Sequence, residues 1–354
     1  MPQPAAASTP TGAAGVPAVP ARLSALWQRG AAFLGCPVAI MGGAMTWVSE
    51  RNLVSAISNA GGFGVIACGS MTPALLDAEI KATRGLTAKP FGVNLITLHP
   101  QLIDLIEVCR ANQVSHVVLA GGIPPSEAIR KVKEYGAKLL CFAPALVLAR
   151  RFIKLGVDAI VIEGHEAGGH VGPVSTAVLA QEILPAVRDV PVFVAGGIGR
   201  GEAIVSYLEM GASGVQMGTR FVCATECIAH PKFKQAFVRA SARDAVTSVQ
   251  LDKRFPVIPV RALANQGTEA FLAKQREVIT RVDAGELDAP AAQLEIEHFW
   301  AGALRRAVIE GDVEHGSVMA GQSVGMVTAE QPVASIIAEL IAQAESALAS
   351  RRVT

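Results

Sequence analysis

The sequence predicts an α/β fold, a parallel (β/α)8 barrel with a C-terminal helical appendage, on three observations. Short, nearly continuous apolar segments alternate with longer amphipathic segments from residue 37 onward. The alternation repeats eight times, and apolar runs of this length are typical of parallel strands buried on both faces. Several amphipathic segments stop at a glycine just before the next apolar run, as at Gly136, Gly156 and Gly211.

The apolar runs give the expected strands, and the amphipathic segments give the expected helices. The strands lie at 37–41, 63–67, 91–96, 116–120, 138–142, 158–162, 191–195 and 213–217. The helices lie near 47–60, 73–84, 100–113, 125–135, 144–155, 176–188, 200–210 and 226–240. Thr72-Pro73, and Ser126 beside Glu127, are helix-start signals for two of these segments.

A doubly wound open sheet is the alternative architecture for alternating strands and helices. That fold would have fewer repeats and a G-x-G-x-x-G fingerprint after its first strand. The first strand here runs into Met41-Gly42-Gly43-Ala44-Met45, which is not that fingerprint. The closed barrel is therefore favoured.

The chain divides into four predicted parts. Residues 1–22 are rich in Ala, Pro, Thr and Gly and are expected to form a disordered tail, and residues 23–241 form the barrel. After about residue 242 the regular alternation of strands and helices stops. A proline-containing loop at 254–260 and helices near 268–284, 290–310 and 331–350 are expected instead. We expect 242–330 to be a helical subdomain that covers the barrel mouth, and 331–354 to be a helix that packs back on the barrel.

Composition excludes several classes of function. A net charge of +1 gives no sign of a nucleic-acid surface or of binding to an anionic membrane. No stretch has eighteen uninterrupted apolar residues, so no transmembrane span is expected. The six cysteines are scattered and form no C-x-x-C pair, so we expect free thiols in a reducing cytoplasm and no metal site. They are Cys36, Cys68, Cys109, Cys141, Cys223 and Cys227.

The stretch 160–170 is the centre of the chemistry that the sequence predicts. An apolar strand-like run ends at Glu163 and is followed by glycines, Glu166, His165 and His170. Histidine exchanges protons near neutral pH, and a glycine-rich backbone lets a ligand come close. This stretch therefore reads as a catalytic loop at the C-terminal end of a barrel strand.

The last two strands of the barrel predict a phosphate site. The seventh ends in Ala195-Gly196-Gly197-Ile198-Gly199, and the eighth in Gln216-Met217-Gly218-Thr219-Arg220. Exposed backbone N–H groups near a helix N-terminus bind anions, and the loops after these two strands often hold a phosphate in such barrels. The structural alternative is that the glycines only make tight turns, which is less plausible for two adjacent loops.

The ends of the first and third strands suit a flat ring such as a flavin. Gly42 and Gly43 admit a ring close to the backbone, and Asn94 offers an amide that can both donate and accept hydrogen bonds. Taken alone, Asn94 would more often be a turn residue.

Four motifs together resemble a known family. They are G-V-N-L at 92–95, E-A-G-G-H at 166–170, A-G-G-I at 195–198 and Q-M-G-T-R-F at 216–221. The ordered set is similar to the nitronate monooxygenase (2-nitropropane dioxygenase) family of FMN-binding barrels, which also contains the FMN-dependent enoyl-acyl-carrier-protein reductase. The resemblance covers about residues 36–330 and implies one FMN.

The resemblance also implies roles for individual residues. His170 matches the catalytic histidine, while His165 lies in the same loop but outside the matched motif, and Glu166 is expected to be a loop hydrogen-bond partner. Glu163 stands where many members have glutamine. The residues placed at the cofactor are Met41, Gly42, Gly43, Asn94, Glu163, Gly168, Gly169, Ala195, Gly196, Gly197, Gln216, Gly218 and Thr219.

Two enzymatic functions fit this family, and nitronate oxidation is narrowly favoured. In it, His170 acts as the base, and alkyl nitronates or nitroalkanes react with O2 to give a carbonyl compound and nitrite. The alternative is NAD(P)H-dependent reduction of an enoyl-acyl carrier protein, or of a quinone. The tail at 311–322 resembles the reductase branch. The stretch 217–231 resembles nitronate enzymes equally well. The loop after the first strand is one residue longer than the reductase pattern.

The remaining expectations concern partners. The substrate is a small molecule, NAD(P)H is a possible electron donor, and the chain forms a possible homodimer. A non-enzymatic barrel that only stores FMN is the third hypothesis, and the ionisable loop argues against it.

Overall fold

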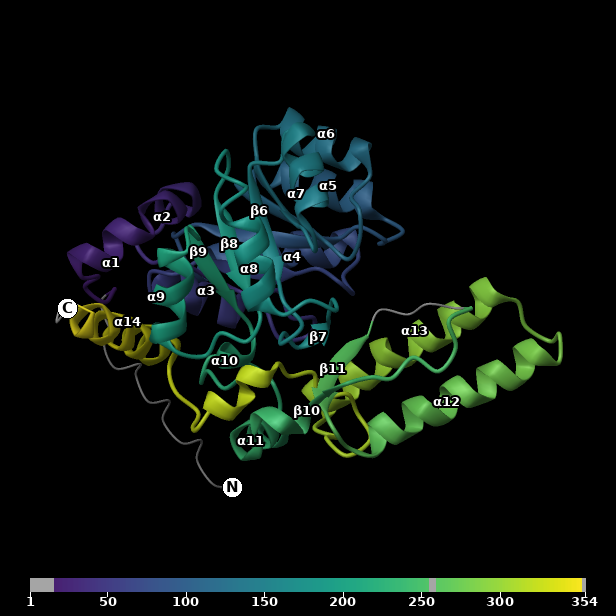
Figure 1. Ribbon diagram of the computed structural model, residues 1–354. Helices are drawn as coiled ribbons and strands as arrows, with labels where there is room; N and C mark the ends of the chain where they lie inside the picture. Colours follow the sequence, from purple (N-terminus) through teal and green to yellow (C-terminus); the bar gives the residue numbers. More distant parts are fainter. Residues whose placement is uncertain (1–15, 255–258, 352–354) are drawn as a thin grey trace, which may run out of the picture.

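An eight-stranded parallel barrel ringed by helices forms the centre of the molecule (Figure 1). The structure, a computed structural model, describes residues 16–254 and 259–351. Most of the expected tail and part of the expected 254–260 loop therefore lie outside the described residues. The barrel strands are β1 Ile40–Gly42, β2 Gly64–Ala67, β3 Phe91–Ile96, β4 His116–Ala120, β5 Lys138–Phe142, β6 Ala159–Glu163, β8 Val192–Ala195 and β9 Gly214–Met217.

The strand order confirms the predicted barrel. The strands run β1-β9-β8-β6-β5-β4-β3-β2, and every neighbouring pair is parallel. An isolated bridge between Met41 and Phe63 joins the two ends of the sheet. The Phe63 carbonyl accepts from the Gly42 N–H at 2.9 Å, so β1 and β2 bring the sheet nearly to closure.

Helices follow the strands as the amphipathic segments predicted. They are α3 Arg51–Asn59, α4 Pro73–Leu86, α5 Leu102–Ala111, α6 Ser126–Glu134, α7 Leu146–Lys154, α8 Thr176–Ile183, α9 Gly201–Glu209, α10 Thr219–Val222 and α11 Pro231–Arg239. Thr72 caps α4 as expected, with its hydroxyl accepting from the Leu75 N–H at 3.4 Å. Ser126, by contrast, is the first residue of α6 and makes no capping bond.

Three helix boundaries differ from the expectation: α11 begins at Pro231 where a helix from residue 226 was expected, and the other two differ for local reasons. The first helix was expected from residue 47, but α3 begins at Arg51 because the Glu50 carboxylate accepts from the N–H groups of Asn52 and Leu53. The helix expected to reach residue 188 ends at Ile183. Leu184 precedes Pro185, and a residue before proline disfavours continued helix.

A helix that the sequence patterns did not predict closes the N-terminal end of the barrel. After α1 (Ala21–Leu26), α2 (Gln28–Leu34) places the fully buried Leu34 in the cluster that fills the barrel interior. The Phe33 carbonyl lies 3.0 Å from the His116 ring, and the Lys138 ammonium lies 4.9 Å from the Phe33 ring centroid. Burial lowers the pKa of His116 to about 4, so this histidine is neutral and structural, as expected.

The segment after the barrel contains strands as well as the expected helices. After the short η1 (Ala242–Asp244), β10 (Ala245–Thr247) and β11 (Val260–Leu263) pair antiparallel with each other. β11 also pairs antiparallel with β7 (Gly169–His170) of the loop after β6. This small sheet was not predicted, and it joins the loop after β6 to a segment about ninety residues further along the chain.

The helical hairpin of the appendage extends away from the barrel (Figure 1). It consists of α12 (Gln266–Asp283) and α13 (Ala289–Arg305) and holds its own small apolar cluster, which includes Phe271, Val278 and Ile296. The chain returns through a π-helical turn, η2 (Arg306–Glu310), and a 3-10 helix, η3 (Gln322–Met326). The parts of the appendage that contact the barrel loops are its strands, the C-terminal end of α13 and this return, described below.

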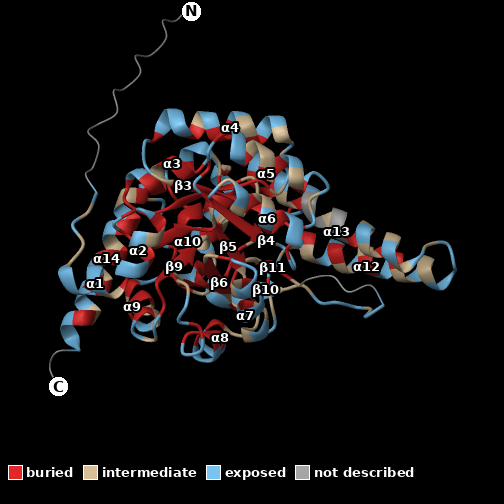
Figure 2. Cartoon of the chain, turned by 90° about the horizontal axis from the view of Figure 1, so that it is seen from above, coloured by how far each residue is buried: buried red, intermediate tan, exposed pale blue. Residues whose placement is uncertain are grey.

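The last helix, α14 (Val333–Ser350), packs against α9 and α3. Among the described helices, it is the one that is long and apolar enough to cross a membrane. Its buried residues Val333, Ile337, Leu340, Ala344 and Leu348 form a stripe with helical spacing that faces the barrel. Figure 2 shows the barrel strands largely buried, with the outer helix surfaces exposed. An amphipathic stripe of this kind is typical of a core helix in a globular protein.

The α2 plug predicts a large stability cost for truncating Leu34. Leu34→Ala should lower the free energy of unfolding by about 2–5 kcal/mol, because it opens a cavity inside the barrel. Leu75→Ala, at an exposed position of α4, is the matched control and should change it by less than about 0.5 kcal/mol. Urea denaturation of both variants measures this, and equal costs would contradict the plug.

Candidate functional site

Strand register places four of the predicted site residues in one row around the barrel mouth. Glu163 on β6 pairs with Ala195 on β8, Ala195 pairs with Gln216 on β9, and Gln216 pairs with Met41 on β1. Paired residues of parallel strands point to the same face, and Met41 and Ala195 belong to the cluster that fills the barrel. The row therefore lines the top of the barrel interior.

Three polar side chains stand at this end of the interior without protein partners. Asn94 and Gln216 are buried, with 5% and 8% of their surface exposed, and Glu163 is half-buried. None of the three side chains makes a hydrogen bond to another described residue. Because buried polar groups are normally hydrogen-bonded, these three are the groups that a bound ligand would satisfy.

Glu163 has an electrostatic character of its own. It is the only acidic residue within the eight barrel strands, all of which are described. Burial raises the pKa of its carboxyl to about 7, and no neighbouring charge offsets that cost. Its carboxyl therefore exchanges a proton near neutral pH.

The glycine loops after β8 and β9 lie beside this row and leave backbone donors free. Gly196 and Gly197 have φ values of +91° and +71°, which only glycine adopts readily. Among the described residues, the N–H groups of Gly196, Gly197 and Gly218 have no hydrogen-bond acceptor. Successive free N–H groups in such a turn form a concave anion site, so the predicted phosphate residues fit that role.

The loop after β1 comes close to the loop after β9. The Gly43 N–H donates to the Met217 carbonyl at 2.9 Å, and a Cβ on Gly43 would lie 3.2 Å from the Gly218 Cα. A side chain on Gly43 would thus fill the space between the two loops. A Cβ on Gly42 would lie 2.7 Å from the Ile57 side chain of α3, so protein fills the space beside both glycines, and their roles at a cofactor stay predictions.

Hydrogen bonds of Ser49 and a left-handed backbone conformation at Trp47 shape the rest of the loop after β1. The Ser49 hydroxyl donates to the Gly43 carbonyl at 2.8 Å and accepts from the Met45 N–H at 3.0 Å. Trp47 has a φ of +68°, a strained left-handed conformation for a bulky residue, and its ring packs against the Arg305 guanidinium at 5.8 Å. This is the loop whose sequence is one residue longer than the reductase pattern.

The loop after β6 holds the two candidate histidines in different ways. The His165 ring Nδ1 lies 2.8 Å from the Gly172 carbonyl, and the His165 N–H donates to the Val174 carbonyl at 2.7 Å. His165 is therefore tied to its own loop. His170 is exposed on β7, where it pairs with Val260 of β11.

Glu166 is a structural partner in this loop, as expected. Its carboxylate accepts from the Thr176 N–H at 2.8 Å and from the Thr176 hydroxyl at 2.9 Å. It thereby binds the N-terminus of α8, where a negative charge is favoured. Thr176 was not singled out from the sequence.

Arg261 is a site residue that sequence reasoning missed. It is buried on β11 opposite Gly169 and donates from Nε to the His165 carbonyl at 3.2 Å and from Nη1 to the Ala245 carbonyl. It therefore joins the loop after β6 to β10 and β11 of the small sheet. Burial lowers the pKa of Arg261, and the nearby Glu166 carboxylate opposes that effect.

A further element beside the site is the segment 319–326, which overlaps the reductase-like tail at 311–322 and which we call the return segment. The Gly321 N–H donates to the Thr219 hydroxyl at 3.0 Å, and the Gln322 N–H donates to the Glu166 carbonyl at 2.9 Å. A Cβ on Gly168 would lie 2.6 Å from the Gly321 nitrogen, and one on Gly199 would lie 2.7 Å from a Met326 carbon. The return segment thus packs on the loops after β6, β8 and β9.

The Thr219 hydroxyl remains available to a ligand. It accepts a hydrogen bond from Gly321, and its own proton has no acceptor among the described residues. A hydroxyl can accept and donate at once, so the predicted donor role toward a phosphate is compatible with this contact.

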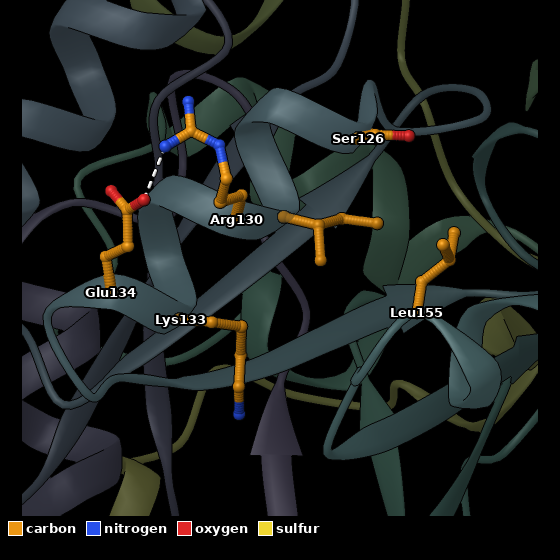
Figure 3. A pocket seen from close by; sticks show the side chains of 6 residues that line it. Ser126, Arg130, Lys133, Glu134 and Leu155 are labelled. Atoms are coloured by element: carbon orange, nitrogen blue, oxygen red, sulfur yellow. Dashed lines mark hydrogen bonds and ion pairs between the residues drawn. The ribbon is translucent and has the colours of Figure 1, made fainter.

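Other features lie apart from this site. Figure 3 shows a shallow surface pocket of about 440 Å3 lined by Ser126, Ile129, Arg130, Lys133, Glu134 and Leu155. It lies on the outer helices α6 and α7 and includes an Arg130–Glu134 ion pair and no predicted site residue. Within the described parts of the chain, no group of three or more His, Cys, Asp or Glu side chains could hold a metal ion. All six cysteines are buried and free.

Comparisons with known proteins agree on one family. A sequence model of the nitronate monooxygenase family matches residues 31–343. FabK from Thermotoga maritima has a TM-score of 0.82 at 36% identity, covering 92% of this chain and 98% of that one. Nitroalkane oxidase from Streptomyces ansochromogenes has a TM-score of 0.74 at 27% identity, covering 91% and 99%.

A relative that is named for a different activity is also similar to this chain. The (3aS,4S,5R,7aS)-5-hydroxy-7a-methyl-1-oxo-octahydro-1H-indene-4-carboxyl-CoA dehydrogenase of Rhodococcus jostii (strain RHA1) is 30% identical over 325 residues. The alignment covers 84% of this chain and 91% of that protein. Similar barrels therefore act on unlike substrates.

The contact between Gly168 and Gly321 predicts that Gly168→Ala loosens the return segment. The added methyl group overlaps a backbone nitrogen, which should cost about 1–3 kcal/mol of stability. Gly172→Ala in the same loop is the matched control, because a Cβ there meets nothing within 4 Å. Thermal unfolding and limited proteolysis near residue 320 measure both, and a Gly168→Ala protein as stable as the control would refute the contact.

The raised pKa of Glu163 predicts a pH-dependent stability in the ligand-free protein. The unfolded carboxyl ionises near pH 4.5 and the folded one near pH 7, so the folded state loses relative stability as pH rises between these values. Glu163→Gln should therefore be more stable than the natural chain at pH 8, by about 1–3 kcal/mol, and nearly equal to it at pH 4.5. Urea unfolding at both pH values measures this, and a difference that does not change with pH would contradict it.

Proposed function

Since the chain belongs to the nitronate monooxygenase family and is a flavin-type oxidoreductase, we propose that it reduces the double bond of an enoyl thioester with FMN as its cofactor. The proposal concerns the substrate and the residues that act on it. It ranks reduction above nitronate oxidation, which the motifs alone narrowly favoured.

The position of the return segment is the observation that carries this ranking. The tail sequence at 311–322 resembles the enoyl reductase branch, and its last residues contact Gly168, Thr219 and the Glu166 carbonyl. The segment that resembles the reductases therefore helps to build the site. The similarity to FabK, which fits the reductase branch, and to a carboxyl-CoA dehydrogenase supports a thioester substrate.

The described residues fit an FMN in the barrel mouth. The free N–H groups of Gly196, Gly197 and Gly218, with the Thr219 hydroxyl, would hold the phosphate. The unpartnered amides of Asn94 and Gln216 and the carboxyl of Glu163 would bond to the polar parts of the cofactor, and the bare backbone at Gly42, Gly43 and Gly168 would lie along it. When bound, FMN would supply hydride chemistry.

His170 would supply the proton that completes the reduction. Adding a hydride at the β-carbon of an enoyl thioester leaves the α-carbon needing one proton. A histidine titrates near neutral pH and can donate it. Arg261 and β11 hold the strand that carries His170.

Nitronate oxidation is the second candidate, and the β1 loop favours it. That loop is one residue longer than the reductase pattern and contains the strained Trp47. The family name and the nitroalkane oxidase likeness point the same way. In this chemistry His170 would remove the acidic α-proton of a nitroalkane, and O2 would be the oxidant.

Anaerobic absorbance spectroscopy separates the two candidates. If the proposal holds, NADH or NADPH bleaches the bound flavin, and crotonyl-CoA restores its colour as butyryl-CoA forms. A flavin that ignores both nicotinamides but is reduced by ethyl nitronate would overturn the reductase assignment in favour of the second candidate.

The histidine assignment predicts a selective loss in His170→Ala. Turnover should fall by about 10²–10⁴-fold, the usual effect of removing a general acid or base, while FMN content stays unchanged. His165→Ala is the comparison, because the two residues share one loop. If His165→Ala lost turnover and His170→Ala kept it, the roles of the two histidines would be reversed.

A further inference from the structure

Glu163 is an ionisable group in the barrel mouth that the chemistry above leaves without a defined role. It lies in the row with Ala195, Gln216 and Met41, and its carboxyl has no hydrogen-bond partner among the described residues. A carboxyl differs from an amide of the same shape in one respect, which is that it can take up or release a proton.

Among the described residues, no charged group contributes to the pKa shift of Glu163, and burial is its one cause. On the strands, His116 begins β4 and Lys138 begins β5, so both lie at the opposite end of the barrel beside Phe33. In the loop that follows β6, the Glu166 carboxylate bonds to Thr176, and the His165 ring bonds to Gly172.

The polar and charged side chains named below, on elements packed against that loop, also bond to groups other than Glu163. Arg261 of β11 directs Nε and Nη1 at the carbonyls of His165 and Ala245, not at Glu163. Thr176 of α8 is neutral and already bonded. Burial is accordingly the cause that raises the pKa of Glu163 to about 7.

We infer that Glu163 is a proton-holding residue of the flavin site, which takes up one proton when the bound flavin is reduced. The inference rests on the proposed FMN site. With oxidised FMN bound, the carboxyl would be partly ionised near neutral pH, and the flavin itself would be uncharged at its ring. Reduction by two electrons and one proton would make the ring anionic, and two like charges at close range disfavour each other. A second proton then binds to the Glu163 carboxylate, so the site takes up two protons for two electrons.

The inference predicts how the flavin midpoint potential depends on pH. Above pH 7, the extra proton changes the reduction equilibrium tenfold for each pH unit, which steepens the slope by about 30 mV per pH unit for a two-electron couple. Glu163→Gln cannot take up this proton and should lack the added slope. Glu166→Gln, in the same loop but bonded to Thr176, is the matched control and should keep the natural slope.

The experiment titrates the purified holoprotein with dithionite and reference dyes between pH 6 and pH 9, without any substrate. A slope that is the same in the natural chain and in Glu163→Gln would overturn the inference and leave the reductase proposal standing. A protein that binds no FMN would overturn both.

A second measurement covers the case in which Glu163→Gln fails to fold. The visible spectrum of oxidised FMN in the natural protein should shift with an inflection between pH 6 and pH 8, because the adjacent carboxyl changes its charge. A spectrum that stays constant over this range would also overturn the inference.

Discussion

The parallel register of β6, β8, β9 and β1 is the constraint on which the site depends. It fixes Glu163, Ala195, Gln216 and Met41 at one level, and it brings the glycine turns of β8 and β9 together just above them. A shift of one residue in any of these ladders would turn an interior side chain to the outside of the barrel. The apolar interior beneath, from Val161 and Phe193 down to Leu34, holds that register in place.

Much of the barrel was predictable because its information is local. Each strand is a short apolar run and each helix carries an apolar stripe, so periodicity alone located all eight barrel strands to within a few residues. The α2 plug was not predictable in this way, since nothing in 28–34 shows that Leu34 enters a barrel. The three-stranded sheet was also missed, because β7 has only two residues and its partner β11 is remote in sequence.

The site shows the same division between local and remote information. The glycines at 196, 197 and 218 and the amides of Asn94 and Gln216 belong to strand ends, where a motif can be recognised. Arg261 belongs to no motif. Its role depends on the carbonyls of His165 and Ala245, which come within hydrogen-bonding distance only in the folded chain. The return segment had a recognisable sequence, but only the structure shows that it contacts the loops after β6, β8 and β9.

The pairing of β1 with β9 has a consequence for how the molecule assembles. β1 has a single bridge to β2 but a ladder to β9, and Ile40 pairs with Val215, so closure joins segments roughly 175 residues apart. Contacts of such long range form slowly and late in folding. During synthesis, β1 must wait for β9 to leave the ribosome, and the return segment emerges later still. The mouth of the barrel is therefore completed only when nearly the whole chain exists, so a truncated or stalled product has no finished cofactor site.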